Sequence, residues 1–387
     1  MSQEPVDKVS QLLRKGAKIG KDVTIDASAE ISAKRIVIGD AVHIGPNTRI
    51  FARDLEVGTD VRIGANCKLR CNRISIGENS IIGDSNDIQP HALFAMGVTS
   101  HIGTQAHIRG REVIFGDEVF ITDGLRVGGG GSNEPEALLT VGDRCTLHNN
   151  FINVAKPVTI GSDVGFSMDT ILITHGYWQS VLEGYSATFA PITIHDWVIL
   201  GMRVIVLPGV EIGEGTTVGA GAIVARSLPP NCIAVGAPAQ AVKTDYPSRP
   251  SDEEQDAIVK QILHEYKEHL VYKGFDLKDF EEIQGGILLE VTKDNVQTNI
   301  SYFRGPDFPT RAFAGSENVI LTFNQDRRPR ESVIMNLRTL EIAGELTPVV
   351  HDIRDFLRRH GIRFYGYGFF RSLPPQIALD LDRDVEN

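Results

Sequence analysis

Residues 38–63 read IGDAVHIGPNTRIFARDLEVGTDVRI, and within each set of three they carry an aliphatic residue at every sixth position. Ile38, Ile44 and Ile50 form one set of three, and Val57 and Ile63 begin the next set. A period of six matches neither an α-helix nor the simple alternation of a strand. It fits a short strand followed by a tight turn, where a residue that lacks a Cβ relieves the turn.

The same register continues in both directions along the chain, in triplets that step by 18 to 20 residues. Its other members are Ile19, Ile25, Ile31, Leu69, Ile76, Ile82, Ile88, Met96, Ile102, Ile108, Phe115, Ile121, Val127, Val141, Leu147, Asn153, Ile160, Phe166, Leu172, Leu200, Val206, Ile212, Val218 and Val224. We therefore expect about ten three-sided coils whose inward side chains stack from coil to coil. Interruptions at 128–139 and 173–191 predict loops, and loops held on a rigid solenoid often carry binding groups.

The composition is that of a globular protein with 42% hydrophobic residues, and the repeat explains its excess of 38 glycines. A formal net charge of −11 argues against nucleic acid as a partner. No apolar run reaches the roughly 20 residues of a membrane span. Residues 1–16 predict a short amphipathic helix without the features of a signal peptide, so we expect a cytoplasmic protein.

The cysteines and histidines do not predict a metal site. Cys67 and Cys71 lack a second ligand pair at suitable spacing, so reduced buried thiols are expected. His101 and His107 are six residues apart, which suggests that they stack on one side of the solenoid. A third ligand for a catalytic zinc is not apparent beside them.

After residue 244 the repeat ends, and the proline-containing segment 246–250 reads as a linker. Ser251 and Glu254 form a capping box that predicts a helix over 251–273. Strands are expected near 286–291, 297–303, 318–324, 332–338 and 362–369, with a second helix near 347–360. We therefore expect a smaller α+β accessory domain over 251–387.

A set of motifs lies between residues 141 and 243: Ile173-Thr174-His175, Phe189-Ala190-Pro191-Ile192, Trp197, Leu207-Pro208-Gly209-Val210, Val218-Gly219-Ala220-Gly221, Leu228-Pro229-Pro230-Asn231, Val235-Gly236-Ala237-Pro238-Ala239 and Lys243. In these motifs the chain resembles the galactoside, maltose and colanic-acid O-acetyltransferases of the hexapeptide-repeat superfamily. The resemblance implies a left-handed parallel β-helix over 17–244, and acetyl-CoA as the acyl donor. It also implies a homotrimer with each active site between two subunits.

The same resemblance implies that His175 is the catalytic base. An acceptor hydroxyl must lose its proton as it attacks the thioester carbonyl, and an imidazole can take that proton and pass it to the leaving thiolate. Asn149 is the candidate for a second catalytic residue that holds the acceptor, although it could instead belong to an asparagine ladder or a turn. The implied coenzyme A positions are Gly201, Ala220, Arg226 and Lys243, and Met202 departs from the family's small serine at its position.

Three further residues are candidates for contact with the acceptor: His148, Trp178 and Glu183. Glu183 could equally be a solvated loop carboxylate, and Trp178 could equally pack within the loop or stack on a sugar face. The function that follows is O-acetylation of a sugar hydroxyl on a glycan or glycan precursor, as in polysaccharide biosynthesis. The alternatives are N-acetylation of an amino sugar and, from another class, a non-catalytic scaffold.

Overall fold

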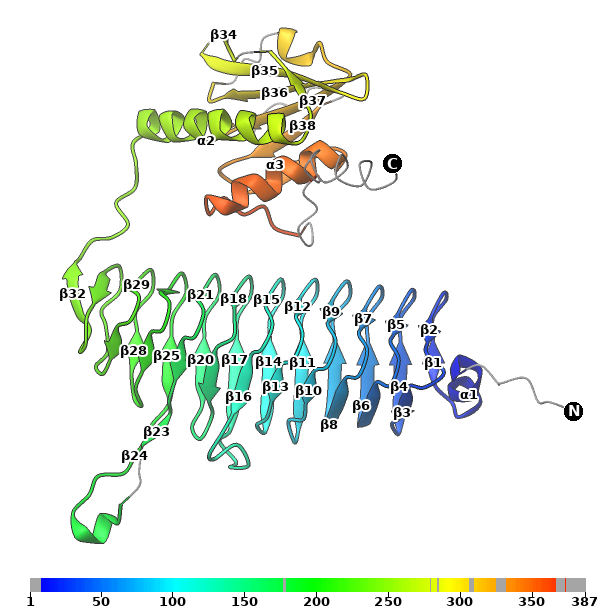
Figure 1. The fold of residues 1–387 in the computed structure, drawn as a ribbon, viewed down its shortest axis with the longest axis vertical. Helices are drawn as coiled ribbons and strands as arrows, with labels where there is room; N and C mark the ends of the chain where they lie inside the picture. Colours follow the sequence, from blue (N-terminus) through cyan, green and yellow to red (C-terminus); the bar gives the residue numbers. More distant parts are fainter. Residues whose placement is uncertain are drawn as a thin grey trace, which may run out of the picture. The chain divides into compact units, whose positions relative to one another are not determined.

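The computed structural model describes residues 8–176, 179–278, 280–283, 285–305, 310–324, 332–366 and 373. The chain divides into two compact units, Met1–Ser248 and Arg249–Asn387. The first unit is a parallel β-helix that α1 (Lys8–Arg14) precedes, and Figure 1 shows its successive coils in sequence order. No helix among the described residues is long and apolar enough to cross a membrane.

Each coil has three sides, and each side pairs in parallel with the same side of the next coil. The first sides are β1 (Lys18–Ile19), β4 (Arg35–Ile38), the second halves of β6 (Arg49–Val57) and β8 (Lys68–Ile76), β11 (Leu93–Met96), β14 (Glu112–Phe115), β17 (Leu138–Val141), β20 (Val158–Ile160), β25 (Ile192–Ile194) and β28 (Glu211–Ile212). The second sides are β2 (Thr24–Ile25), β5 (His43–Ile44), β7 (Arg62–Ile63), β9 (Ile81–Ile82), β12 (His101–Ile102), β15 (Phe120–Ile121), β18 (Thr146–Leu147), β21 (Gly165–Phe166), β26 (Ile199–Leu200), β29 (Thr217–Val218) and β31 (Ile233–Val235). The strand β32 (Gln240–Lys243) pairs antiparallel with β31.

The third sides are β3 (Glu30–Ser32), the first halves of β6 and β8, β10 (Asp87–Ile88), β13 (His107–Ile108), β16 (Arg126–Gly128), β19 (Phe151–Asn153), β22 (Ile171–Leu172), β27 (Ile205–Val206) and β30 (Ile223–Val224). The parallel β-helix predicted from the period of six is confirmed. Its left hand stays a prediction.

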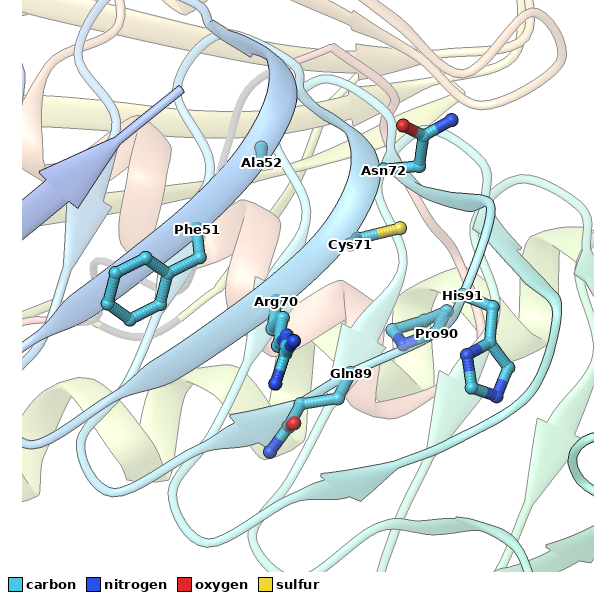
Figure 2. Close-up of a pocket in the computed structure, with 8 residues that line it drawn as sticks. All are labelled: Phe51, Ala52, Arg70, Cys71, Asn72, Gln89, Pro90 and His91. Carbon is cyan, nitrogen blue, oxygen red and sulfur yellow. The ribbon is translucent and has the colours of Figure 1, made fainter. Parts of the chain in front are cut away.

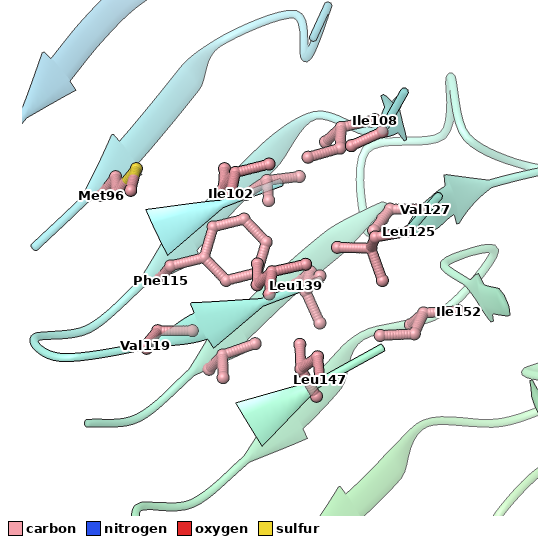
Figure 3. Packing of buried hydrophobic residues seen from close by; sticks show 14 of the residues in the cluster. Met96, Ile102, Ile108, Phe115, Val119, Leu125, Val127, Leu139, Leu147 and Ile152 are labelled. Carbon is pink, nitrogen blue, oxygen red and sulfur yellow. The ribbon is translucent and has the colours of Figure 1, made fainter. Parts of the chain in front are cut away.

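The aliphatic register forms one continuous core. Ile44, Ile63, Ile82, Ile121 and Leu147 from five of the second sides are fully buried. Figure 3 shows how side chains from all three sides meet in this column. Every coil is therefore stabilised chiefly by its neighbours, as the stacking of repeats requires.

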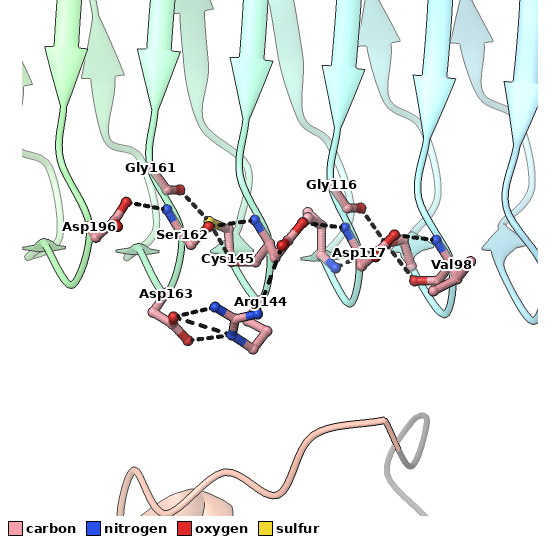
Figure 4. Close-up of polar contacts among 12 residues, drawn as sticks. Val98, Gly116, Asp117, Arg144, Cys145, Gly161, Ser162, Asp163 and Asp196 are labelled. Atoms are coloured by element: carbon pink, nitrogen blue, oxygen red, sulfur yellow. Dashed lines mark hydrogen bonds and ion pairs between the residues drawn. The ribbon is translucent and has the colours of Figure 1, made fainter.

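The glycines of the repeat serve a different purpose from the one that the sequence suggests. Gly116 does not have a positive φ, whereas Glu118 two residues later has a φ of 54°. A Cβ on Gly116 would lie 2.3 Å from the Asp143 carboxylate and 2.8 Å from the Gly142 carbonyl carbon of the next coil. The carboxylate of Asp143 in turn accepts a hydrogen bond of 2.9 Å from the Asp117 backbone N–H (Figure 4). Glycine is needed here because the next coil approaches so closely.

The second unit is a mixed sheet with two helices. Its sheet has the order β33 (Asp276–Leu277), β35 (Gly286–Lys293), β36 (Val296–Phe303), β37 (Glu317–Thr322), β38 (Val333–Asn336) and β39 (Glu341–Ala343), and β34 (Glu281–Ile283) also pairs with β35. The helices are α2 (Asp252–Tyr272), which begins with the predicted capping box at Ser251, and α3 (Pro348–Arg359). The predicted α+β class is confirmed for this part of the chain.

One predicted strand of this unit is absent from the described residues. Residues 362–366, the described part of the strand expected near 362–369, are not in a strand, and 367–369 lie outside the described residues. Ile362 is bonded instead to the end of α3, where its N–H donates to the Leu357 carbonyl at 3.2 Å.

Candidate active site

His175 lies at the base of the long loop 173–191, which leaves the β-helix after β22. His175 and Gly176 form β23, which pairs antiparallel with β24 (Thr188–Phe189) to make a hairpin that projects from the solenoid (Figure 1). The His175 ring stacks on the Phe189 ring with 5.6 Å between centroids and 14° between planes. The backbone N–H of Ala190 donates to the Thr174 carbonyl at 3.0 Å, which closes the base of the hairpin. Strand pairing and ring stacking thus restrict the imidazole.

The Asn153 side chain sets the protonation pattern of this imidazole. Its Nδ2 donates to the carbonyl oxygens of Gly128 and Gly130, both at 3.0 Å. Since carbonyls only accept, this end of the amide must be the NH₂ group, and its Oδ1 therefore faces His175 Nδ1 at 2.8 Å. Nδ1 must donate to that oxygen, so in the neutral ring the lone pair is on Nε2. This is the tautomer that a general base acting through Nε2 requires.

The loop that follows β16 lies beside Nε2. A Cβ on Gly130 would be 3.2 Å from His175 Nε2, so any side chain at this position would crowd the nitrogen. The two carbonyls bonded by Asn153 hold this glycine-rich segment against the solenoid. The three elements together place the His175 Nε2 nitrogen next to the glycine-only segment 128–131.

Asn153 is the residue of this site that the sequence analysis did not include. Its place in the repeat nevertheless indicated that it is unusual. It occupies a position that is otherwise apolar in the hexad register, after Val141 and Leu147, and it is only 2% exposed. A buried polar side chain must find hydrogen-bond partners. Asn153 finds them in the two glycine carbonyls, in His175 and in the Thr174 hydroxyl, which donates to its Oδ1 at 2.6 Å.

Asn149 and His148 lie at a different corner of the coil from His175. We define the His175 corner as the connections from third to first sides, which include 52–53, 71–72, 89–92, 109–111, 129–137, 154–157 and 173–191. The Asn149 corner comprises the connections from second to third sides in the C-terminal coils, 148–150, 167–170, 201–204 and 219–222. The strand β19 separates Asn149 from Asn153 by about 13 Å at the usual rise per residue.

At its own corner Asn149 is exposed, and it exchanges hydrogen bonds with Asp169 of the next coil. Its Nδ2 donates to Asp169 Oδ1 at 2.6 Å, and its Oδ1 accepts from the Asp169 N–H at 3.2 Å. His148 Nδ1 lies 3.2 Å from the Thr122 hydroxyl, and burial lowers the pKa of His148. His148 is therefore mostly neutral at neutral pH. Within one chain the structure brings Asn153, not Asn149, to His175.

The expected coenzyme A residues are divided among three places. Gly201 and Ala220 meet at the Asn149 corner, where a Cβ on Gly201 would be 2.6 Å from the Ala220 nitrogen. Arg226 is exposed after β30, on the His175 corner. Lys243 ends β32, and its Nζ lies 5.3 Å from the centre of the Tyr246 ring.

The remaining candidates lie in the long loop or outside the described residues. Glu183 is exposed in the short helix η1 (Val181–Glu183). Trp178 lies outside the described residues. No group of three or more His, Cys, Asp or Glu among the described residues could hold a metal ion. His101 and His107 lie on different sides of a coil, in β12 and β13, because a step of six residues moves to the next side, so the expectation that they stack on one side was wrong.

Comparison with known proteins finds the same repeat and several acetyltransferases. Residues 191–226 match the family model described as the hexapeptide repeat of succinyl-transferase. The chain is 43% identical over 95 residues to a protein of Schizosaccharomyces pombe that bears the name of an acetyltransferase, a match covering 24% of this chain and 45% of that protein. It is 32% identical over 120 residues to the galactoside O-acetyltransferase of Escherichia coli, covering 28% and 59%.

A solved hexapeptide-repeat acetyltransferase of Vibrio cholerae, in complex with acetyl coenzyme A, aligns with 39% of this chain and 70% of its own, at 18% identity and a TM-score of 0.24. The chain spans about half of the length of the curated relatives that it matches. Residues 191–226 thus carry a hexapeptide repeat, and over about a quarter of its length this chain is similar in sequence to proteins that bear the name of acetyltransferases.

Proposed function

We propose that this protein transfers the acetyl group of acetyl-CoA to a hydroxyl group of a sugar, with His175 as the general base. The observation that carries the proposal is the hydrogen bond from His175 Nδ1 to Asn153 Oδ1, which leaves the lone pair on Nε2 beside Gly130. The partial identity with the galactoside O-acetyltransferase supports the choice of a sugar hydroxyl over other acceptors. We keep the cytoplasm as the expected compartment.

In the proposed reaction, Nε2 takes the proton from the acceptor hydroxyl as its oxygen attacks the thioester carbonyl. The Asn153 oxygen accepts a hydrogen bond from Nδ1 of the imidazolium that forms, which keeps the ring in the same orientation. When the tetrahedral intermediate collapses, the carbon–sulfur bond breaks and the imidazolium returns the proton to the coenzyme A thiolate. The products are the sugar ester, free coenzyme A and neutral His175.

The direct test is release of coenzyme A thiol in the presence of acetyl-CoA and a panel of neutral sugars, acidic sugars and amino sugars, followed by mass spectrometry of the products. A sugar ester with a mass increase of one acetyl group supports the proposal. Transfer to amino sugars alone would favour N-acetylation. Absence of both thiol release and coenzyme A binding would leave a scaffold as the better account.

We further propose a homotrimer, because the two corners with candidate site residues can meet only between copies. Asn149, Gly201 and Ala220 lie on one corner, and His175 lies on another. Two methionines on the Asn149 corner, Met168 and Met202, are 47% and 49% exposed. Large apolar side chains at such exposure in adjacent coils are typical of a surface that a second protein covers. A cyclic arrangement would place each His175 corner against the Asn149 corner of a neighbour.

A mixing experiment tests this arrangement. His175→Ala and Asn149→Ala subunits should each form poorly active assemblies, and coexpression with different tags should restore activity. In a random equal mixture, about one quarter of the interfaces combine an intact His175 with an intact Asn149 from the neighbour, because the two residues are drawn independently. Purified mixed trimers should recover about one third of the wild-type activity, because one of the three interfaces in a 2:1 trimer pairs an intact His175 with an intact Asn149 of the neighbour. No recovery in mixed trimers, or full activity of a monomer in light scattering, would contradict the shared site.

The second unit is proposed to select the acceptor or fix the assembly, without a part in catalysis. Each unit has its own hydrophobic core, so a chain that ends at Thr244 should remain folded and bind coenzyme A. We expect its activity toward the natural acceptor to fall more than its slow hydrolysis of acetyl-CoA. Calorimetry with coenzyme A and circular dichroism check this. If coenzyme A binding disappears while the trimer persists, the second unit belongs to the donor site.

A further inference from the structure

Two adjoining cavities lie on the His175 corner, in the coils that precede the candidate active site. The first has a volume of about 580 Å³ and is lined in part by Phe51, Arg70 and Gln89 from successive coils (Figure 2). The second has a volume of about 480 Å³ and extends to Arg111 and Asn133. Both include Asn72 and His91, so they form one continuous groove along the β-helix, which we call the corner groove.

The corner groove is connected to the active-site loop by direct contacts. His91 Nε2 lies 2.8 Å from Asn133 Oδ1, and Arg111 Nη1 donates to the Pro135 carbonyl at 2.9 Å. Both partners belong to the connection 129–137, whose Gly130 lies against His175 Nε2. The same segment therefore borders the groove at one end and the proposed base at the other. A chain-like acceptor that reacts at His175 can continue along the corner into the groove.

The chemistry of the corner groove matches a carbohydrate. Asn72, Gln89 and Asn133 present side-chain amides, which both donate to and accept from sugar hydroxyls. Phe51 is 36% exposed at the far end, where an aromatic ring can pack against the apolar face of a pyranose. The groove is shallow and open along successive coils, which suits an extended chain.

The charges of the corner groove favour an acidic chain. Arg70 lies in the first cavity, and Lys68 is two residues earlier on the same side of the same strand. Among the described residues, neither of these side chains forms an ion pair or a hydrogen bond. Their neighbour Asp87 is already engaged by Arg109 Nη2 at 2.5 Å and by Gln89. Burial alone would raise the pKa of Asp87, but the hydrogen bonds from Arg109 and Gln89 outweigh it and lower this pKa.

The number of available cations separates an acidic glycan from a nucleic acid. Binding to a phosphate backbone commonly uses roughly 6–10 contacts from Lys and Arg. The groove is lined by two cations, Arg70 and Arg111, and by one carboxylate, Glu134. Lys68 lies beside Arg70 on the same strand, and Arg111 Nε lies 3.7 Å from the carboxylate of Glu112. A few cations among several amides suit a polymer with widely spaced carboxylates and many hydroxyls.

We propose that the corner groove binds an acidic oligosaccharide, and that it holds the part of the acceptor that does not react. This inference rests on the proposed function, because it names the class of acceptor that the proposed active site would use. Binding can nevertheless be measured without acetyl transfer, so the two proposals can fail separately.

The test measures binding of a fluorescein-labelled hexamer of galacturonic acid to the full-length protein by fluorescence anisotropy. Arg70→Gln should weaken binding about tenfold or more, because a hydrogen bond to a charged group is lost. The matched control is Arg62→Gln on the second side of the same coil, which should bind like the wild type. Maltohexaose, a neutral chain, should bind more weakly and should not respond to Arg70→Gln.

Three outcomes would overturn the proposal: equal binding by the wild type and Arg70→Gln, equal weakening by Arg62→Gln, or tighter binding of a dodecamer of thymidylate than of the uronate hexamer. If transfer is observed, a second measurement applies. The KM for an acidic oligosaccharide acceptor should rise about tenfold in Arg70→Gln with kcat nearly unchanged, since binding remote from the reacting group is lost. If no acetyl transfer is found while the hexamer still binds through Arg70, the proposed function fails and the groove assignment stands.

Discussion

His175→Ala should lower kcat by 10²-fold or more at neutral pH, because a positioned general base contributes about 10² to 10⁴ in rate. The acceptor hydroxyl would then have to transfer its proton to water in a site arranged for Nε2. Steady-state release of coenzyme A thiol measures the loss. Binding of coenzyme A should change little, since the substitution alters none of the residues expected to contact it, which are Gly201, Ala220, Arg226 and Lys243.

The control for this experiment is His175→Gln, which keeps a polar side chain of similar reach. An amide cannot accept a proton at neutral pH, so this variant should be as slow as His175→Ala. Both should keep the thermal midpoint of the wild type within a few degrees, because His175 is only partly buried and lies at the base of a loop. If either variant turns over at a rate near that of the wild type, another group is the base.

The fold could be predicted from the sequence because the hexad register is an energetic requirement. Every coil must bury its own share of one column, so apolar residues recur in triplets along nearly the whole of the first unit, with interruptions at 128–139 and 173–191. The reason for the glycines could not be predicted. Glycine is favoured both by a turn that requires a positive φ and by a close approach between coils. Only the structure shows that the close approach is the reason, because Gly116 lies against Asp143 and does not have a positive φ.

The candidate site was predictable in part. The long loop and the motif around His175 direct attention to this residue, and the structure gives it a partner and a tautomer. Asn153 was not predicted as part of the site, because its partners come from the loop after β16 and the base of the hairpin, which are distant in sequence. Asn149 remains a prediction, since its corner can meet His175 only if two copies associate.

Asn153→Leu should also lower the rate of acetyl transfer strongly. Replacement by leucine, which has the same branching of side-chain heavy atoms, removes the oxygen that accepts the proton of His175 Nδ1. The ring can then adopt the other tautomer, and loss of the correct tautomer in a comparable hydrolytic site costs up to about 10⁴. We expect kcat to fall about 10²-fold in Asn153→Leu, with coenzyme A binding retained. Thiol release and calorimetry give the two values.

Asn153→Asp is the matched variant that separates a positioning role from a structural one. Both substitutions remove the Nδ2 group, which donates hydrogen bonds to the carbonyl oxygens of Gly128 and Gly130. Both should therefore lower the midpoint of thermal unfolding. Aspartate, however, keeps an acceptor for His175 Nδ1, and its negative charge stabilises the imidazolium and raises the pKa of the ring. A base with a raised pKa is deprotonated only at higher pH, so the acid limb of the profile of kcat/KM should move to higher pH. Above that limb, Asn153→Asp should be much faster than Asn153→Leu. Equal rates for the two variants at all pH values would mean that Asn153 only holds the loop.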